Sequence, residues 1–249
     1  MQKNYFAPQA KNYALFRPTY PDSLFAFLAD IAPDHLRAWD CGTGNGQAAV
    51  SLARHFREVI ASDVSSEQLT AAVANPRVSY RCVPAEQSGL EDGSVNLITA
   101  AAAVHWFELP AFYNEARRVL SPNGVIALWT YFDMQIDSGI DEALQEFSRV
   151  FLRGYWSQRM EYVLALYQNL PFPFHRIKSP EFYCEQSWNL ERLLSFIETF
   201  SGVKAYIERE GDSPVPRLRQ NLAPLWGELN TERCIRWPLS LCVGRLDGD

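Results

Sequence analysis

The chain has 249 residues, of which 47% are hydrophobic and 21% are charged, and its formal net charge is −6. This balance is typical of one large globular domain, with room for an inserted cap. The negative charge argues against general affinity for nucleic acid, and no apolar run approaches the ~20 residues that a membrane-spanning helix needs.

The cysteines and histidines are scattered and show no metal-ligand spacing. The sequence lacks a C-x-x-C pair, and its first residues lack the apolar segment of a secretory signal. We therefore expect reduced thiols, a cytoplasmic location and no bound metal. We also expect a monomer, because no exposed apolar repeat demands a partner.

Residues 1–21 are rich in aromatic side chains and show no strong periodicity. Two interpretations stay open for this segment. It is either an arm that packs its aromatic rings on the core, or a lid over a ligand site. A helix follows at Asp22–Ala32, where apolar residues recur at helical spacing.

The stretch Ala38–Gly46 reads as a strand that ends in a glycine-rich turn, and it precedes a helix at Gln47–Phe56. Glycines at 42, 44 and 46 let the backbone adopt positive φ and pass close to a ligand. The N-terminus of the following helix favours ligand binding at the same place. A strand, a ligand-binding turn and a helix open a doubly wound α/β domain. The alternative is an ordinary glycine-rich turn without a ligand.

A second short strand, Val59–Asp63, ends in an acid about 20 residues after Gly42. An acid at this place can accept hydrogen bonds from both hydroxyls of a ribose. The alternative role, a helix cap, is already available from Ser65, because Ser65-x-x-Gln68 resembles a capping box ahead of the helix Ser66–Ala74.

Three further strands are predicted, and His105 closely follows one of them. The strands are Val78–Val83, Val95–Ala101 and Val125–Thr130, and a helix at Pro110–Leu120 precedes the last. Ligands of open α/β sheets bind beyond the carboxyl ends of the strands, so His105 should lie at the rim of a pocket. A packed structural histidine is the alternative.

Four motifs, taken together, resemble the class I S-adenosylmethionine-dependent methyltransferases. They are Asp40-x-Gly-x-Gly-x-Gly after a strand, the loop Pro84-Ala85-Glu86, His105-Trp-Phe, and the run that begins at Arg118 and reads Arg-Val-Leu-Ser-Pro-Asn-Gly. Tyr13-x-x-x-Arg17-Pro-x-Tyr20-Pro also resembles the trans-aconitate-methyltransferase-like branch. The resemblance covers about residues 10–131. The chain departs from the family at Pro84, Glu108 and Asn123.

The resemblance implies an α/β fold: a Rossmann-like, seven-stranded, mostly parallel sheet with helices on both faces. An antiparallel seventh strand would lie between the fifth and the sixth. We expect the sixth strand at Glu181–Trp188 and the last at Cys234–Leu246. The whole chain, 1–249, would be a single domain, with a lid arm at 1–21 and a helical substrate cap at 132–179 inserted after the fifth strand.

The resemblance also implies the site residues. S-adenosyl-L-methionine would be the cofactor, and His105 and Tyr20 are the catalytic candidates. The residues expected to bind the cofactor are Tyr13, Arg17, Asp40, Gly42, Thr43, Gly44, Gly46, Asp63, Val64, Ala85, Glu86 and Ala101.

The expected function is methyl transfer to a small-molecule acceptor, for which a carboxylic acid is one candidate. A carboxylate needs only positioning, which the planar fork of Arg17 could provide, whereas an oxygen or nitrogen nucleophile with a raised pKa would need His105 as a base. A non-catalytic protein that binds S-adenosylmethionine is the alternative. A nicotinamide-dependent oxidoreductase is a third reading, but the glycine spacing and the lack of a Tyr-x-x-x-Lys pair argue against it.

Overall fold

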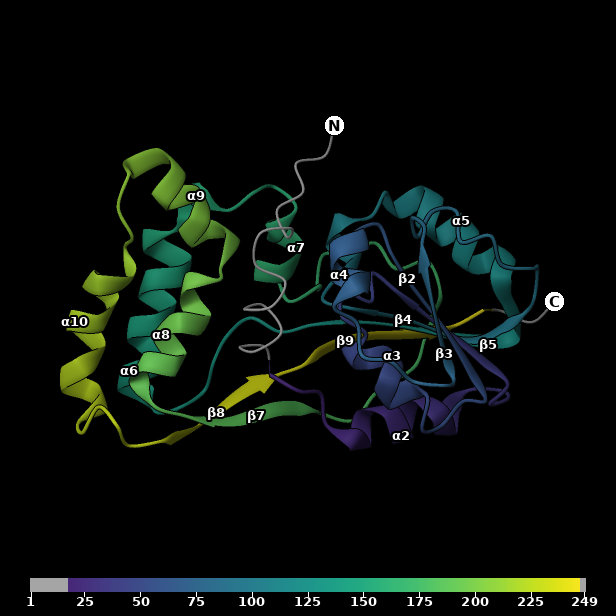
Figure 1. Cartoon of the computed structure of the whole chain (residues 1–249), viewed down its shortest axis with the longest axis horizontal. Helices are drawn as coiled ribbons and strands as arrows, with labels where there is room; N and C mark the ends of the chain where they lie inside the picture. Colours follow the sequence, from purple (N-terminus) through teal and green to yellow (C-terminus); the bar gives the residue numbers. More distant parts are fainter. Residues whose placement is uncertain (1–17, 247–249) are drawn as a thin grey trace.

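The computed structural model describes residues 18–246, which form an elongated molecule with an α/β lobe and a helical lobe (Figure 1). Within these residues, seven strands form one sheet in the order β3-β2-β1-β4-β5-β9-β6. Strands β1 to β5 run parallel to one another, and β9 lies between β5 and β6 and is antiparallel to both. The predicted fold, with an antiparallel last strand inside the sheet, is confirmed. The strands are β1 Arg37–Cys41, β2 Glu58–Asp63, β3 Val78–Cys82, β4 Val95–Ala101, β5 Leu120–Thr130, β6 His175–Arg176 and β9 Ser240–Arg245.

Helices cover both faces of this sheet because successive strand residues point to opposite sides. On β1, Ala38 packs in the cluster that contains α2 (Asp22–Ile31) and α3 (Gln47–Leu52), whereas Trp39 packs in the cluster that contains α5 (Leu109–Val119). Most side chains of β1, β2 and β4 are buried, so these strands read as mainly apolar runs, whereas those of β3 are half-buried or exposed.

The helical lobe is built from two separate parts of the chain. The first part carries α6 (Ser138–Gln145), the π-helix η3 (Glu146–Phe151), the 3-10 turn η4 (Arg153–Tyr155) and α7 (Met160–Leu164). The second carries α8 (Leu190–Glu198), α9 (Ser201–Glu210) and α10 (Val215–Trp226). Helix α10 packs against both α6 and α8. Helix α7 lies on the side of the helical lobe that faces the α/β lobe (Figure 1).

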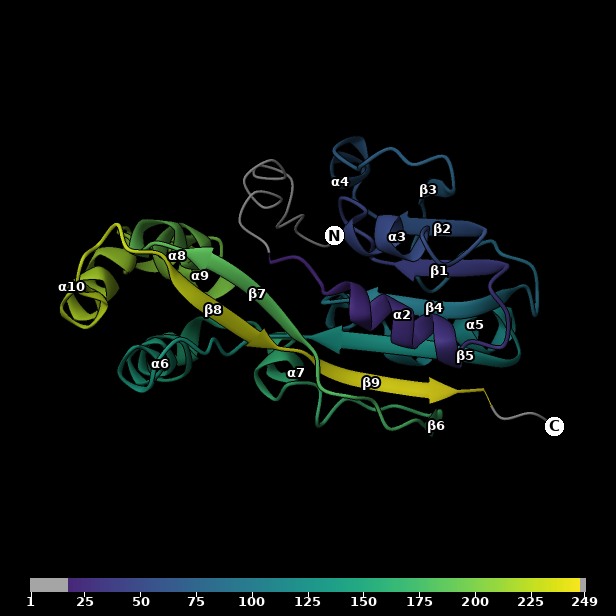
Figure 2. The same cartoon turned by 90° about the horizontal axis from the view of Figure 1, so that it is seen from below.

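An antiparallel ribbon of β7 (Tyr183–Trp188) and β8 (Arg233–Pro238) joins the two lobes, and β8 continues into β9 (Figure 2). The predicted sixth strand at Glu181–Trp188 is therefore wrong, because this segment pairs with β8 outside the main sheet and the two-residue β6 takes that place. The predicted strand Cys234–Leu246 is in fact two strands that pair with different partners. Proline, which has no N–H to donate to a ladder, ends the first of them at Pro238.

Helix α7 is short. It ends at Leu164, and the next turn holds Leu166 and Tyr167 at φ values of +50° and +57°. Within residues 18–246, no helix is long and apolar enough to cross a membrane, and no cluster of His, Cys, Asp and Glu side chains is suited to a metal ion.

Candidate functional site

The glycine loop lies at the carboxyl end of β1, where the sequence places it. Gly42, Gly44 and Gly46 have φ values of +63°, +56° and +85°, in the region that L-residues rarely adopt. The Thr43 N–H donates to the Ser62 carbonyl at 2.9 Å, which fastens the loop to β2. The loop then enters α3 with Gly46 at its N-cap.

A Cβ atom placed on each glycine distinguishes their roles. At Gly42 it would lie 2.6 Å from the Cβ of Ala103, and at Gly46 it would lie 2.1 Å from the Tyr80 hydroxyl oxygen. These two glycines are required by the protein's own packing. At Gly44 the nearest described atom is the Oε1 of Gln68 at 3.9 Å, so the described residues leave open space in front of the loop there.

Gln68 and Asp63 border that open space. The Gln68 Oε1 is buried and has no hydrogen-bond partner among the described residues. The Asp63 carboxylate accepts from the backbone N–H of Gly44 and from that of Ser65, each at 2.9 Å. A carboxylate accepts about four hydrogen bonds, so Asp63 retains capacity for ribose hydroxyls. An orphaned acceptor and a carboxylate beside an open glycine fit the nucleoside of S-adenosylmethionine.

The predicted cap of α4 (Ser66–Thr70) is half confirmed. The Ser65 hydroxyl accepts from the Gln68 N–H at 3.2 Å, as a capping box requires. The reciprocal contact does not form, because Asp63 takes the Ser65 N–H instead. The Gln68 side chain therefore does not bind the Ser65 N–H and lies beside the glycine loop instead. The sequence pattern did not predict this arrangement.

Asp40 lies beneath the loop and is fully buried. Its carboxylate accepts from the hydroxyls of Thr43 at 2.5 Å and Thr99 at 2.7 Å. Burial raises the pKa of Asp40 to about 6, against the opposing effect of these two hydrogen bonds. Through Thr43, Asp40 fixes the loop to β4 as well as to β1.

The other predicted cofactor residues lie at the same edge of the sheet. Val64 follows β2 and is exposed, Ala85 is buried, and Ala101 ends β4. The Glu86 carboxylate accepts from the Glu108 N–H at 2.7 Å, so it supports the turn that carries His105. The parallel strands bring these residues together because their carboxyl ends meet at one edge.

His105 lies in the 3-10 turn η2 (Val104–Trp106), just beyond β4, and is buried. Its Nδ1 is 2.9 Å from the Tyr167 hydroxyl oxygen, and Tyr167 is fully buried. Burial raises the pKa of Tyr167, so the phenol stays protonated.

Arg159 holds the same turn from the helical lobe. Its guanidinium donates to the Trp106 carbonyl and, at 2.8 Å, to the Glu108 carboxylate. Sequence reasoning missed both Arg159 and Tyr167. No local motif marks them, because each reaches the turn from more than 50 positions away.

A cavity of about 100 Å³ lies between this edge of the sheet and the helical lobe, and we call it the rim cavity. Three groups of side chains line it: residues at or just after the ends of β4 and β5, residues of η2, and residues of the segments that run from η4 to α7 and from α8 to α9. They are Ala102, His105, Trp106, Thr130, Tyr131, Phe132, Trp156, Met160, Val163, Phe196, Thr199, Phe200, Ser201 and Lys204. None of these described lining residues is acidic.

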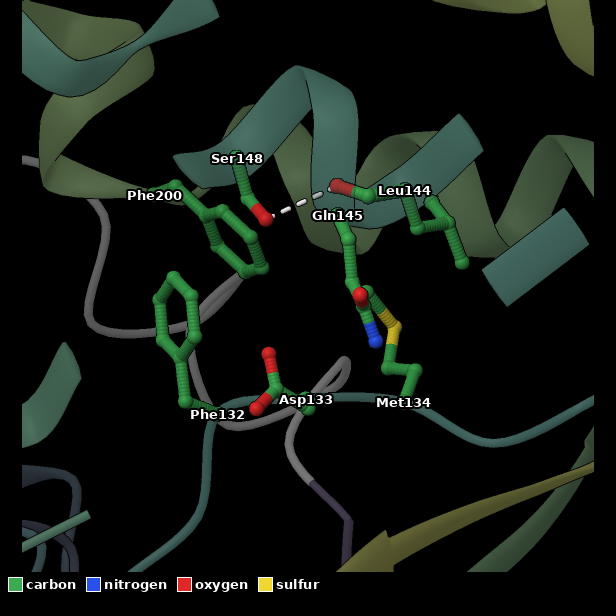
Figure 3. A pocket seen from close by; sticks show the side chains of 7 residues that line it. All are labelled: Phe132, Asp133, Met134, Leu144, Gln145, Ser148 and Phe200. Atoms are coloured by element: carbon green, nitrogen blue, oxygen red, sulfur yellow. Dashed lines mark hydrogen bonds between the residues drawn. The ribbon is translucent and has the colours of Figure 1, made fainter. Parts of the chain in front are cut away.

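A second, smaller pocket shares Phe132 and Phe200 with the rim cavity (Figure 3). It holds about 10 Å³, close to the space of a single water. The Ser148 hydroxyl on its wall donates to the Leu144 carbonyl at 2.8 Å, and the Asp133 carboxylate is paired with Arg149. The rim cavity is therefore the better candidate for an acceptor.

Tyr20 lies near the rim cavity but is not among its described lining residues. Its ring packs edge-to-face on Trp129 at 5.4 Å and on Tyr131 at 6.4 Å, and Tyr131 does line the cavity. Its catalytic role stays a prediction. Tyr13, Arg17 and most of the predicted lid arm lie outside the described residues.

Comparisons with known proteins agree with this geometry. A family model described as a methyltransferase domain matches residues 39–128. A methyltransferase of Dictyostelium discoideum is 32% identical over 222 residues, which are 87% of this chain and 84% of that protein. A type II methyltransferase structure from Anaeromyxobacter dehalogenans is 35% identical, with a TM-score of 0.87 over 94% of this chain and all of that one. A malonyl-[acyl-carrier protein] O-methyltransferase of Dechloromonas aromatica is 37% identical over 123 residues, which are 45% of this chain and 45% of that protein. The chain belongs to the class I S-adenosylmethionine-dependent methyltransferases, and its cofactor is S-adenosyl-L-methionine.

Proposed function

We propose that this enzyme methylates a small-molecule carboxylic acid bound in the rim cavity. The observation that carries the proposal is the composition of the cavity wall. Trp106, Trp156 and four other aromatic rings form much of it, while Lys204 adds a positive charge and no described lining residue is acidic. Such a wall favours an acceptor with an apolar body and one anionic group.

The similarity to the malonyl-[acyl-carrier protein] O-methyltransferase supports the same class of acceptor, because a malonyl group ends in a carboxylate. We also propose that the enzyme is a monomer, as the sequence predicts.

The chemistry asks little of the chain beyond alignment and exclusion of water. S-adenosylmethionine supplies a methyl group on a positively charged sulfur, and the neutral thioether S-adenosylhomocysteine is a good leaving group. A carboxylate oxygen is already a nucleophile, so the residues of the cavity only need to orient it for in-line displacement. Lys204 would bind the carboxylate, and the aromatic walls would keep water from the reacting atoms.

We propose that the cofactor is held by the residues at the carboxyl edge of the sheet that the sequence predicts, from Asp40 to Ala101. Gly44, Asp63 and the loop around Ala85 and Glu86 line the open side of that edge. The helices within residues 132–179 would act as the substrate cap, together with α8 and α9, whose residues share the cavity wall.

The test is a turnover assay on the purified full chain with a panel of aromatic and aliphatic carboxylic acids. Each acid is paired with its primary amide, and formation of S-adenosylhomocysteine is followed. We expect turnover with at least one acid and none with its amide. We expect Lys204→Met to raise the KM for that acid about tenfold, and Lys204→Arg to restore most of it.

Two outcomes would count against the proposal. Methyl transfer to amines or amides, but not to acids, would exclude the carboxylic acid. Calorimetric binding of S-adenosylhomocysteine without transfer to any acceptor would favour the non-catalytic alternative.

A further inference from the structure

Tyr167 and His105 form a buried polar pair behind the rim cavity. Tyr167 follows α7 and is fully buried, whereas His105 follows β4 and lines the cavity. The Tyr167 hydroxyl oxygen lies 2.9 Å from Nδ1 of the imidazole. Nδ1 is therefore engaged by Tyr167, and Nε2 is the other ring nitrogen of this cavity-lining histidine.

The backbone that carries Tyr167 is held in an unfavourable conformation. Leu166 and Tyr167 both have left-handed φ values, which are strained for non-glycine residues. Three contacts enforce this turn: Tyr167 N–H to the Tyr162 carbonyl at 2.8 Å, the Ser240 hydroxyl to the Leu166 carbonyl at 2.5 Å, and the Cys242 thiol to the Tyr167 carbonyl at 3.9 Å. Such strain persists only where the surrounding structure over-determines it, and it is common near functional sites.

The direction of the hydrogen bond follows from the chemistry of the two groups. Burial raises the pKa of the Tyr167 phenol, so this phenol is protonated near neutral pH. A phenol is a better donor than acceptor, and a neutral imidazole offers one acceptor nitrogen. These properties favour donation from the Tyr167 hydroxyl to Nδ1, which would leave the imidazole proton on Nε2.

We propose that Tyr167 is a positioning residue that fixes His105 as the Nε2–H tautomer, so that His105 donates a hydrogen bond to the acceptor. In this role His105 does not remove a proton from the acceptor. The inference rests on the proposed function for the identity of the acceptor. It deepens that function, because an Nε2–H donor suits a carboxylate oxygen and does not suit a nucleophile that must lose a proton.

The tautomer can be measured without any acceptor, by multiple-bond ¹H–¹⁵N spectra of the full chain with ¹⁵N-labelled imidazoles. The His105 signals are assigned by their loss in His105→Gln. In the unmodified protein we expect one neutral tautomer, with the proton on Nε2. In Tyr167→Phe we expect both tautomers, because Nδ1 loses its donor.

Tyr113→Phe is the matched control. Tyr113 is another buried tyrosine, and its hydroxyl donates to the Pro171 carbonyl at 2.5 Å rather than to a histidine. We expect this variant to leave the His105 spectrum unchanged. A proton on Nδ1 in the unmodified protein would overturn the proposal, even if Tyr167→Phe does not fold.

Kinetic measurements then test whether the contact between Tyr167 and His105 contributes to methyl transfer. With a carboxylic acid acceptor, we expect Tyr167→Phe to lower kcat at least tenfold while the Kd for S-adenosylhomocysteine stays within twofold. Unchanged kcat in a variant with mixed tautomers would refute the positioning role. A failure of the enzyme to methylate any acid would refute the proposed function, whereas the spectra would still decide whether Tyr167 sets the tautomer.

Discussion

The substitution Gly44→Val tests the cofactor loop most directly. Gly44 has a φ of +56°, and among the described residues a Cβ there would have only the Gln68 Oε1 within 4 Å. We therefore expect the valine methyl groups to enter the space that we assign to the cofactor. By contrast, a side chain on Gly42 would collide with the Cβ of Ala103. We expect Gly44→Val to fold and Gly42→Val to fail.

Two magnitudes follow from the structure. A left-handed φ costs an L-residue about 1–2 kcal/mol, so the free energy of unfolding should fall by that amount. Two methyl groups in the place of the ligand should weaken binding of S-adenosylhomocysteine at least 100-fold, which is about 2.7 kcal/mol. The loss of affinity should exceed the loss of stability.

Gly93→Val is the matched control. Gly93 has a φ of +62°, and no described atom lies within 4 Å of an added Cβ, but Gly93 precedes β4 at the opposite edge of the sheet. It should lose the same stability and no affinity. Urea denaturation and isothermal calorimetry measure the two quantities. Normal binding by Gly44→Val, or equal loss of binding in both variants, would show that the loop does not hold the cofactor.

Three further predictions concern the residues around the loop and the turn. Asp63→Ala should weaken calorimetric binding of S-adenosylhomocysteine by about 1.5–3 kcal/mol, the range for hydrogen bonds to a charged group, and unchanged binding would remove Asp63 from the site. The pKa of Asp40 is about 6 in the folded protein against its ordinary value of 3.8, so the folded state holds this proton more tightly. Its ionisation should therefore lower stability progressively as the pH rises from about 4 to 7, by up to about 3 kcal/mol. Asp40→Asn cannot ionise, so over the same pH range its free energy of unfolding should rise by that amount relative to the unmodified chain. A difference between the two proteins that does not change with pH would contradict the raised pKa of Asp40. Arg159→Met should lower kcat about tenfold, because the turn that carries His105 loses two donors, while binding of S-adenosylhomocysteine stays within twofold; an unchanged kcat would mean that the turn holds its place without Arg159.

The parts of the fold that the sequence predicted are those with local signals. The acids at the ends of β1 and β2, Asp40 and Asp63, and the glycines between them mark the carboxyl edge of the sheet within 24 residues of chain. Parallel strands then bring the ends of β3 and β4 to the same edge, which is why Ala85 and Ala101 lie where they were expected.

The parts that escaped prediction depend on partners distant in the chain. The segment of β7 alternates like a strand, and only its pairing with β8 reveals that it lies outside the main sheet. Nothing local to the chain after Glu161 indicates that Leu166 and Tyr167 leave the helix, because their conformation is held by contacts with Ser240 and Cys242. Local propensity does not report such contacts.

The contrast between local motifs and contacts distant in the chain also bears on substrate specificity. The cofactor residues come from the α/β lobe, where motifs are local, whereas most of the rim cavity's wall comes from the helical lobe, where no motif predicts the packing. The turn η2 belongs to both, since Glu86 supports it from the sheet edge and Arg159 and Tyr167 hold it from the helical lobe. A substitution in the helical lobe that changes the acceptor can therefore displace His105 as well. It follows that acceptor variants of this enzyme should be assayed for kcat and KM separately, because a new cavity wall and a misplaced histidine would affect the two constants differently.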